Sequence, residues 1–330
     1  MYRYLPGLFK WGYRYSEDHP SLFEDRSAVH QFLVSGIGEL GQYISEGGYD
    51  TVICTHILSA IMLTHLQEQS PLSIGTAFVA TDYTCYPGVG ACRLEHVFVP
   101  DCTYVEAYSN TGIPWFKIVA TGIPVHPEFF RRTEKHLAKG QLNIKETSVH
   151  LLMMGGSMGC GPMEEVVHHV ARKLPEWAEV TIMCGTNKRL YRTLDRRYRL
   201  YGNIHIIGYS DAVSLYMDAA DLYVTKPGGI SVTEAATKNL PMVFVNAVAG
   251  CEQYNMEFFL KMGGAVTADT PYELAATSID LLCSPVKRRS MENRLRKWSR
   301  LDGAENIYRE LQQAEPMVRV EAGREGLGEC

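Results

Sequence analysis

The sequence of 330 residues has few of the features that mark metal sites or disulfide frameworks. Its nine cysteines are scattered singly, with no C-x-x-C pair, and their odd number fits buried thiols in a reducing compartment. Its 11 histidines show no H-E-x-x-H or similar spacing, and no Asp-x-Asp motif is present. We therefore expect neither a zinc site nor another bound metal.

Long hydrophobic runs and a strong net charge are also lacking. No stretch reaches the roughly 18 apolar residues of a spanning helix, and the most apolar one, 57–66, is too short. The first residues lack the uninterrupted apolar core of a signal peptide. A net charge of -5 provides no overall attraction to nucleic acid. We expect a cytoplasmic protein that meets a membrane only from its surface.

What the sequence does contain is the alternation of strands and helices of a parallel α/β protein. It is 46% hydrophobic and 21% charged, as soluble globular proteins are, and its length suggests two domains. Apolar strand-like runs alternate with amphipathic helices after residue 50, and a more regular series begins at residue 148. We predict two doubly wound α/β domains that face each other across a cleft.

The expected boundaries are 1–128 for the first domain, 129–147 for a polar linker with a short helix, and 148–330 for the second domain. Residues 1–49 show helical patterns but no clear strand. The first domain is therefore expected to lack its opening β-α unit.

A glycine-rich loop, "LLMMGGSMGCGPMEEVV", joins a strand to a helix at 151–167. Bare glycine backbone and a helix start attract an anion, although such loops as often serve packing alone. A dinucleotide site would require an acidic residue at the end of the next strand. That strand ends in Cys184, Gly185 and Thr186. An NAD-type oxidoreductase is thus only the second interpretation.

A second strand-to-helix junction, "VTKPGGISVTEAATKNLP" at 224–241, carries Gly228 and Gly229. Two anion-binding helix starts at one edge of a sheet suit a diphosphate. Glu234 follows in the helix, where its carboxylate is able to accept hydrogen bonds from both ribose hydroxyls. The alternative for Glu234 is a surface glutamate favoured by the helix dipole.

A third helix start follows Gly250 in "NAVAGCEQYNMEFFLKMGGA". Glu252, Gln253 and Asn255 are suited to binding sugar hydroxyls, although they are equally ordinary first-turn residues. The three helix starts share the sheet edge at which ligands bind in open α/β folds.

These segments resemble the lipid glycosyltransferases of glycosyltransferase family 28. That family includes processive diacylglycerol glucosyltransferases, monogalactosyldiacylglycerol synthases and the N-acetylglucosaminyltransferase of peptidoglycan lipid II. "VTKPGGISVTEA" is similar to the family's most specific block, and "GGSMGCG", "MCGTNKRL" and "IIGYSDAVSLYMDAADL" resemble its other donor-site segments. "ATDY" and "ATGIPVHPEF" extend the similarity into the first half.

The resemblance implies a GT-B fold of two Rossmann-like domains, with a UDP-sugar held mainly by the second and no further cofactor. The donor-site residues that it implies are Gly156, Ser157, Gly159, Gly185, Asn187, Tyr209, Gly228, Gly229, Ile230, Glu234, Glu252 and Asn255.

Two departures from the family pattern bear on function. Gly250, Cys251 and Glu252 stand where the family has Gly-Gln-Glu, which leaves the donor sugar, glucose or galactose, open. The family's opening strand and Gly-x-Gly-His loop have no counterpart here. Either the start codon is misplaced, or the chain is shortened and its activity impaired.

The resemblance implies inverting transfer, in which one group takes the proton of the acceptor hydroxyl. We predict Asp82, at the end of a strand in the first domain, as this base; the alternative is a turn or N-cap aspartate. His56 is a weaker candidate. The two helix starts would stabilise the diphosphate that leaves.

The N-terminal segment "MYRYLPGLFKWGYRY" combines Arg3, Lys10 and Arg14 with Trp11 and five other aromatic residues. Such side chains suit the headgroup region of an anionic membrane, although a helix that packs on the protein fits equally. We predict transfer of a hexose from a UDP-sugar to a lipid acceptor, expected to be diacylglycerol, at the inner face of the cell membrane. The alternatives are a truncated non-catalytic homologue that binds nucleotide or membrane, an NAD-type oxidoreductase and a sugar-nucleotide epimerase.

Overall fold

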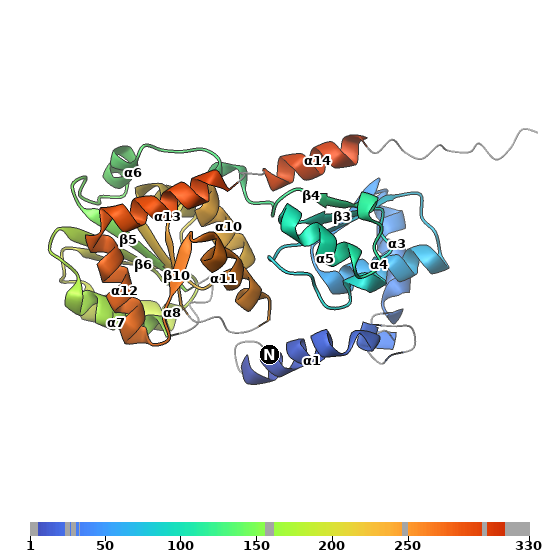
Figure 1. Cartoon of the computed structure of the whole chain (residues 1–330), viewed down its shortest axis with the longest axis horizontal. Helices are drawn as coiled ribbons and strands as arrows, with labels where there is room; N and C mark the ends of the chain where they lie inside the picture. Colours follow the sequence, from blue (N-terminus) through green and yellow to red (C-terminus); the bar gives the residue numbers. More distant parts are fainter. Residues whose placement is uncertain are drawn as a thin grey trace, which may run out of the picture.

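The structure, a computed structural model, describes residues 6–23, 27, 31–32, 34–155, 162–245, 250–298 and 302–313. Within these residues the chain forms a four-stranded and a six-stranded sheet, and every strand pairing is parallel. The sheets lie side by side, each with its own helices (Figure 1). The predicted fold class of two Rossmann-like α/β domains is confirmed.

The first domain is built on the sheet β1-β2-β3-β4. Its strands are β1 (Thr51–Cys54), β2 (Gly75–Val79), β3 (His96–Val99) and β4 (Ile118–Ala120). Its α-helices are α1 (Pro6–Asp18), α3 (Ile37–Gly47), α4 (Ile57–Gln69) and α5 (Val105–Ser109). Short 3-10 turns complete it: η1 (Pro20–Phe23), η2 (Val89–Ala91), η3 (Cys102–Tyr104) and η4 (Trp115–Lys117). A further turn, η5 (Pro127–Phe129), packs its Phe129 into the core of the second domain.

Helices α3 and α4 pack on this sheet and supply seven of the 18 buried residues of its core. One face of the sheet is covered by α14 (Gly303–Gln313), whose Ile307 packs against Ala77, Val79 and Phe98. Asn306 of α14 also donates a hydrogen bond to the carbonyl of Thr121 at 3.2 Å. Figure 1 shows α14 above the first domain. The expected span of 148–330 for the second domain is therefore corrected, because its last described helix packs on the first.

The second domain is built on the sheet β10-β9-β8-β5-β6-β7. Its strands are β5 (Val149–Met154), β6 (Ala178–Met183), β7 (Ile204–Ile207), β8 (Leu222–Thr225), β9 (Met242–Phe244) and β10 (Ala265–Thr267). Its helices are α6 (Lys135–Gln141), α7 (Met163–Lys173), α8 (Lys188–Tyr198), α9 (Val213–Ala219), α10 (Gly229–Thr237), α11 (Cys251–Met262), α12 (Pro271–Cys283) and α13 (Pro285–Lys297).

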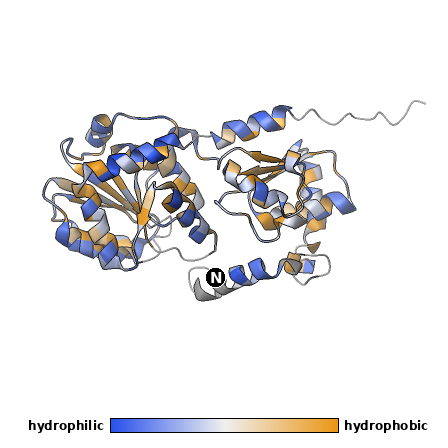
Figure 2. Cartoon of the chain, viewed as in Figure 1, coloured by the Kyte–Doolittle hydropathy of each residue, from blue (hydrophilic) through white to orange (hydrophobic). Residues whose placement is uncertain are grey.

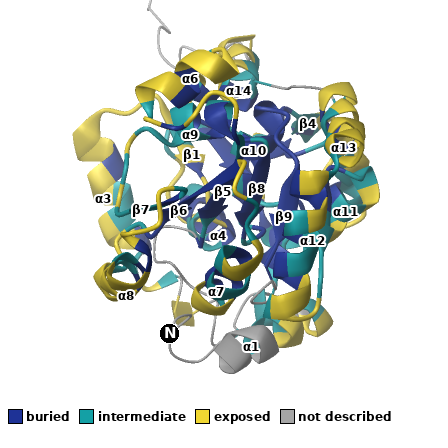
Figure 3. Ribbon diagram, turned by 90° about the vertical axis from the view of Figure 1, so that its left-hand side faces the viewer, coloured by how far each residue is buried: buried dark blue, intermediate teal, exposed yellow. Residues whose placement is uncertain are grey.

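Helices lie on both faces of this sheet, which is why its strands are apolar throughout. One face carries α7, α8 and α12, and the other carries α9, α10 and α11. Figure 3 shows β5, β8 and β9 buried between helices whose outer sides are exposed. Figure 2 shows that the strands of the sheet are hydrophobic and that much of the helix surface is hydrophilic. None of the described helices is long and apolar enough to cross a membrane.

The predicted linker is only partly a linker. Helix α6 packs on α9 through Ala138, Ile144 and Ala219. Lys139 of α6 is buried and donates to the carbonyl of Ser148 at 2.6 Å. Residues 135–144 therefore form part of the second domain. The polar composition of this segment concealed the few apolar residues that anchor it.

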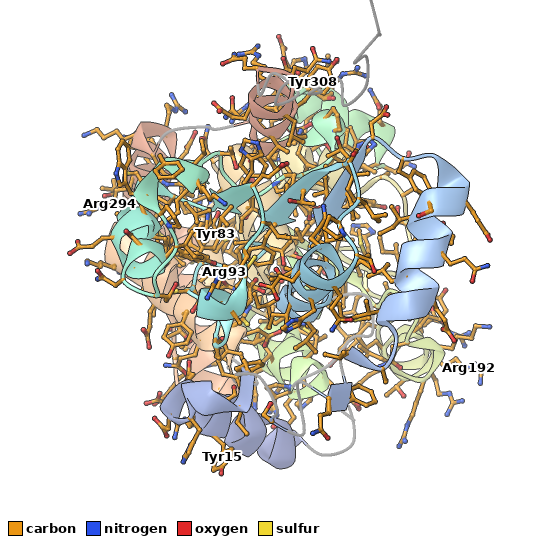
Figure 4. All side chains as sticks on the ribbon, turned by 90° about the vertical axis from the view of Figure 1, so that its right-hand side faces the viewer. Tyr15, Tyr83, Arg93, Arg192, Arg294 and Tyr308 are labelled. Atoms are coloured by element: carbon orange, nitrogen blue, oxygen red, sulfur yellow. The ribbon has the colours of Figure 1, made fainter. Side chains whose placement is uncertain are left out.

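The loop after β2 inserts a tyrosine into the second domain. Tyr83 is fully buried, stacks on Phe258 and meets Phe259 edge-on. Its hydroxyl lies 2.9 Å from that of Thr233 in α10. Figure 4 views the first domain from its outer end, with Tyr83 and Arg93 labelled. The two domains are thus joined at the loop that carries Asp82.

Candidate functional site

The predicted donor-site residues lie at one edge of the second sheet. Gly185 and Asn187 follow β6, Tyr209 follows β7, and Gly228 follows β8. Because all these strands run parallel, their carboxyl ends share this edge, the usual ligand edge of open α/β sheets. Gly156, Ser157 and Gly159 follow β5 in the sequence but lie outside the described residues.

Two of these loops hold their residues in defined local geometry. Gly185 has φ of 56°, a left-handed conformation that favours glycine. The side chain of Asn187 accepts a hydrogen bond from the amide of Leu190 at 3.0 Å and so caps α8. Tyr209 is 70% exposed, next to Asp211, and is free to stack on a ligand.

The two glycines at the start of α10 have different surroundings. A Cβ at Gly228 would come no closer than 3.9 Å to the side chain of Lys226. A Cβ at Gly229 would lie 2.0 Å from the carbonyl oxygen of Thr81 and 2.7 Å from Oδ1 of Asp82. The lack of a side chain at Gly229 therefore allows the backbone of the first domain to approach α10 closely. Gly228 leaves open space at a helix start, where an anion is stabilised.

Glu234 is a partly buried carboxyl group in α10. Burial, with a smaller effect of nearby Glu128, raises the pKa of Glu234 to about 7. Among the residues that the structure describes, none donates a hydrogen bond to this carboxylate. An acceptor in this state gains stability from a ligand that brings hydroxyl donors.

Glu252 and Asn255, the residues predicted to face the sugar, are already engaged. Glu252 forms an ion pair with Lys226, with Nζ 2.7 Å from Oε1. Asn255 is fully buried, and its Oδ1 accepts the amide of Tyr83 at 2.6 Å. Its Nδ2 donates to the carbonyl of Pro227 at 3.0 Å and to Oδ1 of Asp82 at 2.7 Å.

Asp82 follows β2 and lies at the junction of the two domains. Its second oxygen, Oδ2, accepts a hydrogen bond from the hydroxyl of Tyr86 at 2.9 Å. Burial and the nearby carboxylate raise the pKa of the Tyr86 hydroxyl, which keeps it a donor. Burial and Asp82 likewise raise the pKa of the Cys251 thiol to about 12. The predicted base thus lies among neutral groups within reach of the donor domain.

The alternative base, His56, sits at the N-cap of α4. Its Nδ1 accepts a hydrogen bond from the amide of Leu58 at 3.2 Å, and the residue is exposed. It follows β1 and so lies at the same sheet edge as the β2 loop. Its interaction is that of an ordinary helix cap.

Helix α1, in the segment predicted to meet a membrane, packs on α11 of the second domain. The ring of Tyr13 lies over Gly250, whose φ is 63° and whose Cβ, if present, would be 2.9 Å from that ring. The thiol of Cys251 is 3.4 Å from the Tyr13 hydroxyl, and Tyr254 donates to Glu17 at 2.7 Å. One side of α1 is therefore occupied by protein contacts. Arg14 and Tyr15 remain exposed.

A cavity of about 860 Å³ lies between α1 and the rest of the first domain. Glu17 of α1, Glu68 of α4, Tyr86 and Arg93 are among its lining residues. One lining residue, Tyr86, also donates a hydrogen bond to the predicted base, Asp82.

The sequence interpretation missed three residues at this site. Lys226 belongs to the quoted "VTKPGG" segment but was given no role, and it binds Glu252. Tyr83 joins the domains, and Tyr86 holds Asp82. Tyr83 had a signal, since it belongs to the family-like segment "ATDY". Tyr86 had none, because its role depends on the conformation of one loop.

Comparison with known proteins matches two parts of the chain. Residues 150–278 match the glycosyltransferase family 28 C-terminal domain, and residues 1–125 match monogalactosyldiacylglycerol (MGDG) synthase. A processive diacylglycerol beta-glucosyltransferase of Staphylococcus haemolyticus is 28% identical over 235 residues, 71% of this chain and 60% of that protein. The enzyme of the same name from Staphylococcus aureus strain Newman is 25% identical over 82% of this chain and 67% of its own length.

The predicted resemblance to lipid glycosyltransferases is thereby confirmed. The chain spans about 60% of the length of the first of these relatives.

Solved structures share the two-domain arrangement. Acinetobacter baumannii MurG has a TM-score of 0.62 at 16% identity, with 85% of this chain and 78% of that chain covered. A complex of Staphylococcus aureus MnaA with UDP has a TM-score of 0.62 at 13% identity, with 87% and 82% covered. At these identities the likeness establishes the fold, which is of the GT-B type.

Proposed function

Since residues 150–278 match the C-terminal domain of glycosyltransferase family 28, we propose that the chain moves a hexose from a UDP-sugar to a lipid. The observation that carries this proposal is Glu234, an unbonded carboxylate among the described residues. It belongs to α10, the helix that starts after Gly228. A nucleoside diphosphate supplies both partners that this edge lacks, phosphate for the amides and hydroxyls for the carboxylate.

Transfer in this site is inverting. Asp82 accepts the proton of the acceptor hydroxyl while the acceptor oxygen bonds to C1 of the sugar. The bond from C1 to the UDP oxygen breaks, and its electron pair leaves with UDP. The dipole and free amides at the start of α10 stabilise the charge on the departing diphosphate, with no further cofactor required in this scheme.

The acceptor we propose is diacylglycerol, because relatives that cover most of this chain are named for that substrate. Its headgroup occupies the cavity lined by Glu17, Tyr86 and Arg93, which ends at the residue that binds Asp82. The protein works at the inner face of the cell membrane as a peripheral protein. The exposed residues Arg14 and Tyr15 of α1 contribute to contact with an anionic lipid surface.

The proposal is tested with vesicles of diacylglycerol and phosphatidylglycerol and either labelled UDP-glucose or labelled UDP-galactose. We expect label to appear in the lipid extract with one donor. Asp82→Asn should abolish transfer and leave UDP binding intact, whereas Glu234→Ala should weaken UDP binding. UDP binding without lipid labelling would instead support a non-catalytic nucleotide-binding protein, and NADH binding would support an oxidoreductase.

A further inference from the structure

Asn255 uses its whole amide group within the protein. The Tyr83 amide is a donor and the Pro227 carbonyl is an acceptor, so these two neighbours fix which atom is Oδ1 and which is Nδ2. Both Nδ2 hydrogens are then used, one on Pro227 and one on Asp82. No donor of Asn255 is left for a sugar hydroxyl in this arrangement.

The bond from Asn255 to Asp82 also crosses between the domains. Asn255 lies in α11 of the second domain, and Asp82 follows β2 of the first, 173 residues away in the chain. The other Asp82 oxygen is held from within its own domain by Tyr86 at 2.9 Å. The carboxylate is therefore held by groups of both domains, since the Cys251 thiol of α11 also interacts with it.

We propose that Asn255 is a positioning residue that orients the Asp82 carboxylate across the junction of the two domains. The inference rests on the proposed function, in which Asp82 is the base. It gives Asn255 a role through Asp82 in place of direct contact with the sugar. Deprotonation of the acceptor then depends on the second domain, because that domain supplies the Asn255 hydrogen bond.

The chemistry requires this orientation. A general base must direct a lone pair at the proton that it takes, within hydrogen-bond distance. Asn255, Tyr86 and the Cys251 thiol each use one acceptor position of Asp82, and a carboxylate has a further position for the acceptor hydroxyl. Without Asn255 the carboxylate is free to rotate, and the fraction of time in the productive orientation falls.

Three titratable groups from the two domains lie near Asp82. Tyr83 and Tyr86 stand on its own loop, and Cys251 stands on α11. Burial raises the pKa of all three, so they are neutral near pH 7. Lys226 and Glu252 of the second domain form an ion pair with each other.

The test compares Asn255→Asp with the control Tyr83→Phe. Asn255→Asp keeps the shape but places a second carboxylate about where the amide donor stood, which raises the pKa of the Asp82 pair. Tyr83→Phe removes another hydrogen bond between the domains, the one to Thr233 at 2.9 Å, and removes none of the hydrogen bonds to Asp82. All variants are first shown to bind UDP with wild-type affinity.

For Asn255→Asp we expect kcat to fall roughly 10- to 100-fold, with KM for the UDP-sugar within about twofold of wild type. The acidic limb of the kcat–pH profile should move up by about one unit or more. Tyr83→Phe should keep the wild-type profile. A raised KM with an unchanged profile would overturn the proposal and assign Asn255 to the sugar.

A second measurement separates this inference from the proposed function. The carboxyl carbon of Asp82, identified with Asp82→Asn, is titrated by ¹³C NMR in the wild-type chain and in Asn255→Asp. A shifted Asp82 titration in the variant supports the contact between Asn255 and Asp82. If the wild-type chain nevertheless transfers no sugar, the proposed function is wrong and the contact still stands. An unchanged Asp82 titration would overturn the positioning role.

Discussion

Gly228 and Gly229 are adjacent, yet the structure gives them different reasons to lack a side chain. Gly229→Ala places a Cβ against the Thr81 carbonyl, so the domain junction must shift. We expect a loss of about 1–3 kcal/mol in the free energy of unfolding. Gly228→Ala meets open space at φ of -77°, and should leave stability within about 0.5 kcal/mol.

The variants Gly228→Ala and Gly229→Ala also distinguish an effect on stability from an effect on UDP binding. Gly228→Ala should weaken UDP binding, because the added methyl group crowds the helix start where we place the diphosphate. Urea unfolding and UDP titration of both variants check this. Equal stability of the two variants would contradict the close approach at Gly229, and wild-type UDP affinity in Gly228→Ala would contradict the diphosphate site.

Glu234 should make stability depend on pH. Its pKa is about 7 in the folded chain against an ordinary value of 4.5, so between these values the folded state holds a proton that the unfolded state has released. The free energy of unfolding therefore falls as pH rises through this window. Glu234→Gln should be more stable than wild type at pH 8 by up to about 3 kcal/mol, with the gain shrinking toward pH 5. Urea unfolding at both pH values measures it.

Binding of UDP should lower the pKa of Glu234 again. Ribose hydroxyls that donate to the ionised form lower the pKa of Glu234, so UDP binding near pH 7 should release a proton from it. Calorimetry in buffers of different ionisation enthalpy counts released protons, with Glu234→Gln as the control. The same proton count in both proteins would exclude Glu234 from the ribose site.

At the residue scale the sequence predicted which side chains gather at the sheet edge, but not what several of them bind. Glu252 and Asn255 were assigned to a sugar from their position at a helix start, whereas the structure pairs them with Lys226 and Asp82. The Asn255 contact joins residues 173 positions apart. Only the packing of the two domains determines such a bond.

At the scale of elements, α14 ties the C-terminal part of the chain to the first domain. Ile307 is 6% exposed against β2 and β3, whereas Tyr308, the next residue of the same helix, is 57% exposed. Figure 4 labels Tyr308 on this helix. Ile307→Ala should reduce the free energy of unfolding by roughly 2–4 kcal/mol, and Tyr308→Ala should leave it nearly unchanged. Similar losses in the two variants, measured by urea unfolding, would contradict the packing of α14.

The strands and their parallel order followed from the sequence because buried parallel strands are short apolar runs between amphipathic helices. The placement of α14 did not. Its amphipathic pattern shows that one side is buried, but that pattern is the same whichever sheet it covers. The packing of α6 on α9 escaped for a related reason, since Ala138 and Ile144 lie in a mostly polar segment.

At the scale of the whole molecule, two sheets present their carboxyl edges to a common junction. The helix starts that we propose bind the diphosphate belong to one domain, and the proposed base belongs to the other. Contacts of Tyr83, Asn255 and Gly229 join the two domains. In the proposed reaction, donor recognition and proton removal therefore fall to separate domains, and the reaction requires both edges in contact.

The central claim, that this edge binds the UDP part of a sugar donor, is tested most directly by calorimetric titration with UDP, with NADH as the control. We predict saturable binding of UDP with a micromolar dissociation constant, a strong loss in Glu234→Ala, and no binding of NADH. A folded chain that binds no UDP, or that binds it equally well without the Glu234 carboxylate, would contradict the claim.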